Sequence, residues 1–99
     1  MNDFTKLVIK NIKKIPEGEV KSYGEIAKIA GKPRGAREVS RILHSCSKKY
    51  KLPWQRVINS QGKISLTGTG GEIQKEILIS EGIKFDKSGK IIKSRSEKE

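Results

Sequence analysis

The sequence predicts a mainly α fold with a small β component, organised around a helix-turn-helix. Two short helical segments joined by a Gly-Pro turn, between residues 22 and 46, carry this prediction. The chain has 99 residues, enough for one small domain. Apolar residues make up only 33% of the chain, but they recur at regular spacing, which favours a folded core over disorder.

The first element is an amphipathic helix over residues 3–15. Its apolar residues recur near helical spacing: Phe4, Leu7, Val8, Ile12 and Ile15. Lys13 and Lys14 suit the negative end of the helix dipole, and Pro16 ends the helix. Residues 20–21 are too short to assign.

The helix-turn-helix follows. Ser22 and Glu25 have the spacing of a capping box, which starts a helix with Ile26, Ala27 and Ile29 on its apolar face. Gly31 suits the end of that helix, and Pro33 lies just beyond it. A third helix is expected over residues 35–46, with three residues facing inward: Val39, Ile42 and Leu43.

The β component and a fourth helix complete the chain. A basic loop over 48–53 leads to an extended segment at 57–59 and a turn at 60–63 before 64–66. Thr69 and Glu72 again have capping-box spacing, and the helix they start ends at Gly82 with three residues inside: Ile73, Ile77 and Leu78. A hairpin of 83–85 with 91–92 closes a domain over residues 1–92, and residues 93–99 are expected to be a disordered tail.

Charge indicates the kind of partner. Twenty-two basic residues against 11 acidic ones give a net charge of +11, which favours nucleic acid, an anionic membrane or an acidic protein. A basic protein that is merely soluble is the alternative. No apolar run approaches the ~20 residues of a membrane span, and no signal pattern is present. One cysteine and one histidine make neither a disulfide nor a metal site, so we expect a cytoplasmic, reduced chain without cofactor or metal.

The third helix and its exit hold the densest positive charge. Six basic residues face the single acid Glu38 between positions 34 and 51: Arg34, Arg37, Arg41, Lys48, Lys49 and Lys51. The second helix of a helix-turn-helix is the one that enters a DNA groove, and the small Ala36 and Ser40 would allow a close approach. A solvated basic face is the alternative; the spacing favours DNA.

Three further features have open interpretations. Trp54 is either a core residue, which composition alone favours, or a stacking surface for a base. Cys46 is a nucleophile only with a base beside it, and the nearby His44 would point elsewhere on a helix, so an unreactive thiol is favoured. Residues 68–71 either cradle a phosphate or form a flexible loop, the simpler interpretation.

Several motifs in one order resemble a known family. The sequence contains, in succession, Ile15-Pro16-x-Gly18-x-Val20-x-Ser22-Tyr23-Gly24-x-Ile26-Ala27, Gly31-x-Pro33-x-x-Ala36-Arg37-x-Val39 and Pro53-x-x-Arg56-Val57-Ile58. Over residues 4–85 this pattern resembles the DNA-binding domain of O6-alkylguanine-DNA alkyltransferases. Those enzymes have Pro-Cys-His-Arg where this chain has Pro53-Trp54-Gln55-Arg56. Tryptophan in place of the reactive cysteine is typical of alkyltransferase-like proteins.

The resemblance implies a winged helix-turn-helix-like domain and a non-enzymatic role. Such a protein binds and flips O6-alkylguanine in duplex DNA, inhibits or replaces direct reversal and directs the lesion to nucleotide excision repair proteins. We expect a monomer, nucleoid-associated if the source is bacterial. A winged-helix-type transcription regulator that binds undamaged DNA is the alternative, and an enzyme using Cys46 is a third possibility.

The resemblance also implies residue roles. Tyr23 matches the tyrosine that pushes on the target phosphate, and Arg37 the arginine that fills the space left by the flipped base. Four residues accompany them in DNA binding at the minor groove: Arg34, Ala36, Ser40 and Arg41. The lesion pocket is expected to comprise Tyr23, Trp54, Val57, Thr67 and Gly68, with the carbonyls of Trp54 and Val57 accepting from the guanine amine.

Four residues match structural positions of the former active site: Gln55, Arg56, Asn59 and Glu81. Gln55 replaces the histidine of the enzymes' proton relay, so Glu81 is expected to be a structural hydrogen-bonding group. Cys46 stands where the enzymes have a bracing asparagine, and Thr67 where they have a pocket tyrosine.

Overall fold

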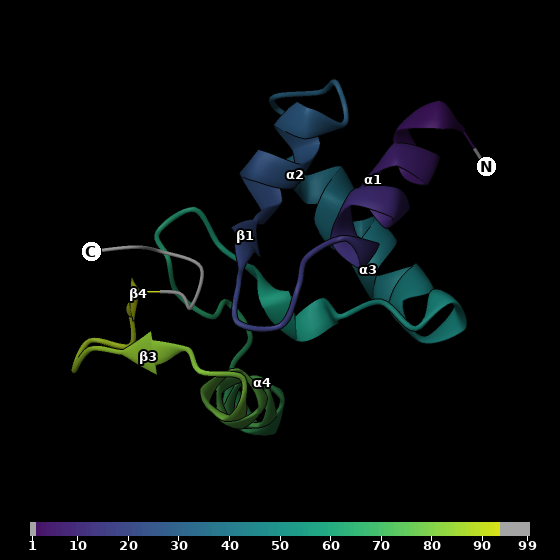
Figure 1. The fold of residues 1–99 in the computed structure, drawn as a ribbon. Helices are drawn as coiled ribbons and strands as arrows, with labels where there is room; N and C mark the ends of the chain where they lie inside the picture. The colour runs from purple at the N-terminus through teal and green to yellow at the C-terminus, as the bar shows by residue number, and fades with distance from the viewer. Residues whose placement is uncertain (1, 94–99) are drawn as a thin grey trace.

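The computed structural model describes residues 2–93. Figure 1 shows three helices, α1 (Asp3–Lys13), α2 (Tyr23–Ile29) and α3 (Ala36–Tyr50), packed together at one end of the molecule. The helix α4 (Gly68–Ser80) lies apart from them, beside a hairpin of β3 (Lys84–Phe85) and β4 (Ile91–Lys93). The 3₁₀ turn η1 (Trp54–Arg56) and the strand β2 (Val57–Ile58) lie between the two parts. The mainly α fold with a helix-turn-helix is therefore confirmed.

The helix-turn-helix forms through the predicted local signals. The Ser22 side chain accepts from the backbone of Glu25, and the Glu25 side chain accepts from the backbone of Ser22, so the capping box is present. Gly31 adopts the left-handed region with φ of 99°, which suits a residue without a side chain after the end of α2. Gly35 precedes α3 at a crowded point, where an added Cβ would lie 3.1 Å from the Lys32 carbonyl oxygen.

The third helix is longer than predicted. It continues to Tyr50, so the loop expected from residue 48 begins only at Lys51, whose φ of 53° ends the helix. Lys48 and Lys49 are exposed, while Tyr50 packs against the core. Packing of the partly buried Tyr50 against the core stabilises this last turn, although the sequence of residues 48–51 is basic and predicts a loop.

The core lies among α1, α2 and α3. Its members are apolar and nearly inaccessible to solvent: Phe4, Val8, Ile9, Ile12, Ile15, Ile26, Ala27, Ala30, Val39, Leu43, Leu52 and Val57. Two residues predicted on inward faces are exposed instead, Leu7 at 41% and Ile29 at 53%. Each lies at the edge of its helix's apolar stripe, where sequence spacing alone does not decide burial.

The fourth helix is rotated relative to its predicted face. It begins at Gly68 after Thr67, two residues before the expected start, and no side chain caps it. Gln74 and Leu78, one turn apart, are its buried residues, and Ile73 is 47% exposed. The capping box at Thr69 and the inward position of Ile73 were therefore wrong. A polar side chain occupies the inward position because its amide donates to the backbone carbonyls of Gln55 and Val57.

Short strands join distant segments. The strand β1 (Lys21–Ser22) pairs in parallel with β2, with Lys21 opposite Val57 and Ser22 opposite Ile58. The predicted hairpin is present as the antiparallel pair β3–β4. Residues 64–66 form no strand, although Lys63 bridges to Lys90. Strand β4 includes Lys93, the first residue of the expected tail, and residues 94–99 lie outside the described residues. None of the helices between residues 2 and 93 is long and apolar enough to cross a membrane.

Candidate nucleic-acid interface

The outer face of α3 carries a stripe of exposed side chains. Its members follow helical spacing: Arg37, Ser40, Arg41, His44 and Lys48. Within residues 2–93, no acidic side chain forms an ion pair with Arg34, Arg37 or Arg41, whereas the neighbouring Lys32 pairs with Glu38 at 3.4 Å. Ala36 is half-buried beside Arg37 at the start of the helix. The stripe is therefore positively charged and available to an anionic partner such as a phosphate backbone.

The parallel pairing of β1 with β2 places Tyr23 near Trp54. Tyr23 begins α2 directly after β1, and Trp54 lies in the turn directly before β2. Both side chains are half-buried and pack against the core. The Tyr23 hydroxyl lies 3.5 Å from the Ser65 Oγ, which links α2 to the loop before α4.

A cavity of about 150 Å³ opens between these elements. We call it the Trp54 cavity, and its walls come from α2, α3, η1, the following loop and α4: Tyr23, Ser40, Leu43, His44, Ser47, Trp54, Leu66 and Gln74. It is smaller than the roughly 300–1,000 Å³ of pockets for drug-sized ligands. Ser40 and His44 belong both to this wall and to the exposed stripe of α3, so the cavity adjoins the charged face.

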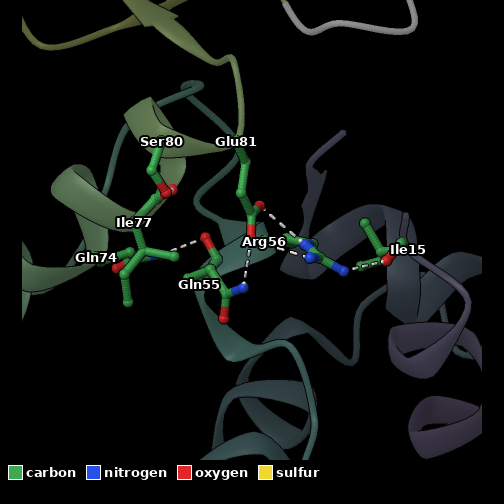
Figure 2. Close-up of polar contacts among 7 residues, drawn as sticks. All are labelled: Ile15, Gln55, Arg56, Gln74, Ile77, Ser80 and Glu81. Atoms are coloured by element: carbon green, nitrogen blue, oxygen red, sulfur yellow. Dashed lines mark hydrogen bonds and ion pairs between the residues drawn. The ribbon is translucent and has the colours of Figure 1, made fainter. Parts of the chain in front are cut away.

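A buried ion pair fixes the segment that carries Trp54. The Arg56 guanidinium donates from Nε to Oε1 of Glu81 at 3.0 Å and from Nη2 to Oε2 at 2.9 Å. Its Nη1 donates to the carbonyl of Ile15 at 2.8 Å, and the Gln55 amide donates to Oε2 of Glu81 at 2.9 Å (Figure 2). These bonds connect η1 to the end of α4 and to the segment after α1.

The same contacts set the charge state of the pair. Hydrogen bonds from Arg56 lower the pKa of the Glu81 carboxyl, against the opposing effect of burial. The hydrogen bond to Glu81 raises the pKa of Arg56. Both groups are therefore charged at neutral pH. Glu81 is engaged by Arg56 and Gln55, consistent with a structural hydrogen-bonding group.

Gln74 makes a second connection between α4 and this segment. The residue is 2% exposed, and its Nε2 donates to the carbonyls of Gln55 at 3.0 Å and Val57 at 3.1 Å. Figure 2 shows the amide of Gln74 directed toward Gln55. The Trp54 carbonyl meanwhile accepts from the backbone N–H of Val57. Both carbonyls expected to face a guanine amine thus already accept one hydrogen bond, leaving one lone pair each.

The other predicted site residues lie around this centre. Asn59 shapes a turn, since its Oδ1 accepts from the backbone of Gln61 at 2.9 Å and of Lys63 at 3.0 Å. Thr67 and Gly68 are exposed at the start of α4, outside the wall of the Trp54 cavity. Cys46 is partly buried against the core and also lies outside that wall. The structure thus joins Tyr23 and Trp54 in one cavity, whereas Val57 is buried in the core and, like Thr67 and Gly68, lies outside the cavity wall.

Several cavity residues were missed by sequence reasoning. Leu43, His44 and Ser47 have the α3 spacing that a helical projection from Ser40 would have indicated. Leu66 and Gln74 had no such signal, because their position depends on how α4 and its preceding loop pack.

The helix-turn-helix, the basic face of its second helix and the adjoining cavity define a DNA-binding domain of helix-turn-helix type. A family model described as the DNA-binding domain of 6-O-methylguanine DNA methyltransferase matches residues 3–83. The chain belongs to this family, which confirms the resemblance found in the sequence motifs.

Characterised relatives match along nearly the whole chain. A DNA base-flipping protein of Vibrio parahaemolyticus is 50% identical over 91 residues, covering 92% of this chain and 91% of the relative. Alkyltransferase-like protein 1 of Schizosaccharomyces pombe is 38% identical over 87 residues, covering 86% of this chain and 81% of that protein. The crystal structure of the S. pombe protein with damaged DNA containing O6-carboxymethylguanine superposes with a TM-score of 0.75 at 37% identity, covering 92% and 88% of the two chains.

Proposed function

We propose that this chain is a non-enzymatic DNA damage sensor that binds duplex DNA through α3, flips an O6-alkylguanine out of the helix and holds it in the Trp54 cavity. One observation carries the proposal. By the sequence pattern, Trp54 occupies the position of the family's reactive cysteine, and it lines a cavity that adjoins the exposed basic stripe of α3. The relatives named for base flipping and the S. pombe complex with damaged DNA support it.

The chemistry of Trp54 suits holding rather than reacting. Alkyl transfer needs a soft, ionisable nucleophile such as a thiolate, and indole has none at neutral pH. Cys46 does not replace it, because its side chain packs against the core outside the cavity wall. An indole face instead offers an apolar surface to the base and to an alkyl group on O6, whose burial contributes about 25 cal/mol per Å².

Flipping requires the cost of unstacking to be offset. Extruding a base costs a few kcal/mol, less for a damaged pair. Stacking against an aromatic side chain returns about 1–3 kcal/mol. In the proposed complex Tyr23, at the cavity wall, displaces the target phosphate, and Arg37, exposed on the first turn of α3, fills the space left in the duplex.

The family resemblance extends the proposal to the fate of the lesion. A bound but unrepaired O6-alkylguanine is withheld from direct reversal and passed to nucleotide excision repair proteins, with the sensor acting as a cytoplasmic monomer. The test is whether lesion-containing DNA treated with this protein becomes a better substrate for excision by purified repair proteins. An unchanged excision rate would contradict this extension.

The binding step is tested by affinity. We expect the protein to bind a duplex with one O6-methylguanine more tightly than the same duplex with guanine at that position. Equal affinities for the two duplexes would contradict the proposed role as a lesion sensor. The alternative, a regulator that binds undamaged DNA, would then remain. A footprint at one sequence, independent of the lesion, would support that regulator.

Arg37 is tested against a matched control. Arg37→Ala should weaken lesion binding more than binding to undamaged DNA, because the arginine acts where the base has left the stack. Arg34 is an exposed arginine in the turn before α3. Arg34→Ala should weaken binding to both duplexes equally and reduce the slope of log K against log salt concentration by about 0.9. A uniform loss for Arg37→Ala would make it an ordinary phosphate contact.

A further inference from the structure

A groove lies between α1 and the end of α3, apart from the Trp54 cavity. It has a volume of about 450 Å³, and we call it the α1 groove. Its walls come from α1, the residue that follows α1 and the last residue of α3: Lys6, Ile9, Lys10, Lys13, Lys14 and Tyr50. Ile9 is 7% exposed and Tyr50 is half-buried, whereas the four lysines are exposed. The groove therefore has an apolar floor bordered by positive charge.

The positive charge of this groove is not neutralised within residues 2–93. Lys6, Lys10 and Lys13 have the i, i+4, i+7 spacing of one helix face, and the ion pairs in that range include none of them. The ammonium groups of Lys13 and Lys49 lie 5.8 and 5.4 Å from the centre of the Tyr50 ring. A cation–π contact attracts an ammonium group but leaves its charge in place. The groove is therefore a site of concentrated positive charge around an aromatic ring.

The stability of α1 does not explain this arrangement. Like charges four residues apart repel each other, and the groove contains two such pairs, Lys6 with Lys10 and Lys10 with Lys14. The helix dipole favours a lysine in the last turn, such as Lys13, but not Lys6 in the first half of the helix. A partner that brings negative charge to the groove would remove this repulsion.

The groove and the face proposed to bind DNA lie on different sides of α3. Nine residues separate Arg41 from Tyr50, which is two and a half turns at 3.6 residues per turn, so the two side chains leave the helix in opposite directions. An acidic protein segment matches the groove, because its carboxylates pair with the lysines and an apolar side chain on it covers Ile9 and the Tyr50 ring. The backbone of a duplex offers phosphates but no apolar side chain for this floor.

We propose that the α1 groove is a docking surface for an acidic segment of a partner protein that carries an apolar side chain between its carboxylates. The opposite directions of Arg41 and Tyr50 allow the protein to hold DNA on α3 and such a partner on α1 at the same time. The inference goes beyond the proposed function and depends on it only for the face that the DNA occupies.

Peptide binding in the absence of DNA tests the proposal. The probe is a fluorescein-labelled peptide of six glutamates with one phenylalanine at its centre, followed by fluorescence anisotropy at about 0.15 M salt, where the Debye length is about 8 Å. We expect the wild-type protein to bind this peptide. A matched peptide with alanine in place of the phenylalanine should bind about tenfold more weakly, because it loses the apolar contact with the groove floor.

Two variants with the same change in charge locate the binding site. Lys6→Gln/Lys10→Gln should weaken binding of the phenylalanine peptide about three- to tenfold, because two ion pairs are lost. Its urea midpoint should stay close to that of the wild type, since lysine and glutamine have similar helix propensities. Lys84→Gln/Lys87→Gln removes two exposed lysines from the hairpin, away from α1 (Figure 1), and should change peptide binding by less than about twofold.

The outcomes distinguish the possible occupants of the groove. Absence of binding, equal binding of the two peptides or equal losses in the two variants would overturn the docking surface. If Lys6→Gln/Lys10→Gln loses as much affinity for an O6-methylguanine duplex as for the peptide, the groove contacts DNA and the proposal is also overturned. A wild-type protein that binds the peptide as expected but shows no preference for O6-methylguanine over guanine would contradict the proposed function and still support the docking surface.

Discussion

Replacing Arg56 tests whether its buried ion pair with Glu81 fixes the turn η1, which carries Trp54. The variant Arg56→Met keeps much of the side-chain volume and loses three hydrogen bonds of 2.8 to 3.0 Å, two to Glu81 and one to the carbonyl of Ile15. Glu81, whose side chain is 7% exposed, would then be a buried carboxylate without its cation. Breaking a buried ion pair in this way costs about 3–5 kcal/mol. For a domain of this size the melting temperature should fall by roughly 12–40 °C.

Urea unfolding provides the assay. Trp54 is the one tryptophan in the sequence and lies two residues from Arg56, so its fluorescence reports this site, while circular dichroism reports the helices. The double variant Arg56→Met/Glu81→Leu should be less destabilised than the sum of the single variants, because no unpaired charge remains.

An exposed ion pair supplies the control. Lys32 and Glu38 lie 3.4 Å apart with side chains 51% and 43% exposed, so Lys32→Met should cost less than about 1 kcal/mol. If Arg56→Met costs no more than Lys32→Met, or if the two single effects simply add in the double variant, the buried pair does not hold this segment.

Three further predictions concern separate features. The stabilisation from the lowered pKa of Glu81 is fully present above about pH 4.5 and is lost as the pH falls through that lowered pKa. Between roughly pH 5 and 2 the urea midpoint should therefore fall less in Glu81→Gln than in the wild type, and parallel curves would contradict this. Ser22→Ala removes the 3.0 Å hydrogen bond that the Ser22 Oγ accepts from the backbone N–H of Glu25. The free energy of unfolding in urea should fall by about 1 kcal/mol. Ser60→Ala, at an exposed position, is the control and should leave it unchanged. Trp54→Ala should reduce the ratio of affinities for O6-benzylguanine and O6-methylguanine duplexes, and an unchanged ratio would make Trp54 a core residue.

The sequence predicts those parts of the fold that are determined by residues close together in the chain. The capping box at Ser22, the left-handed Gly31 and the turn before α3 each depend on a few neighbouring residues, and all three are present. The face of α4 was wrong because burial of Gln74 depends on carbonyls 17 and 19 residues away, which no helical spacing reveals.

The candidate site also contains residues that the sequence identifies and contacts that depend on distant segments. Motif resemblance identified Tyr23 and Trp54, and the pairing of two-residue strands, too short to predict, places both at one cavity. Arg56 and Glu81 were named from the resemblance alone, because 25 residues separate them and no local pattern links them. Thr67 and Gly68 were expected in the pocket but lie outside its wall, since α4 begins at Gly68 and directs this turn outward.

The central claim is that the protein binds the alkylated base and does not react with it. The most direct measurement incubates the protein with a duplex carrying an isotopically labelled methyl group on O6 of one guanine, in the presence of excess unmodified duplex. The account predicts that the labelled duplex is retained by the protein against this competitor and that the label stays in the DNA. Label recovered on the protein, or retention of the labelled duplex only in proportion to its share of the total duplex, would contradict it.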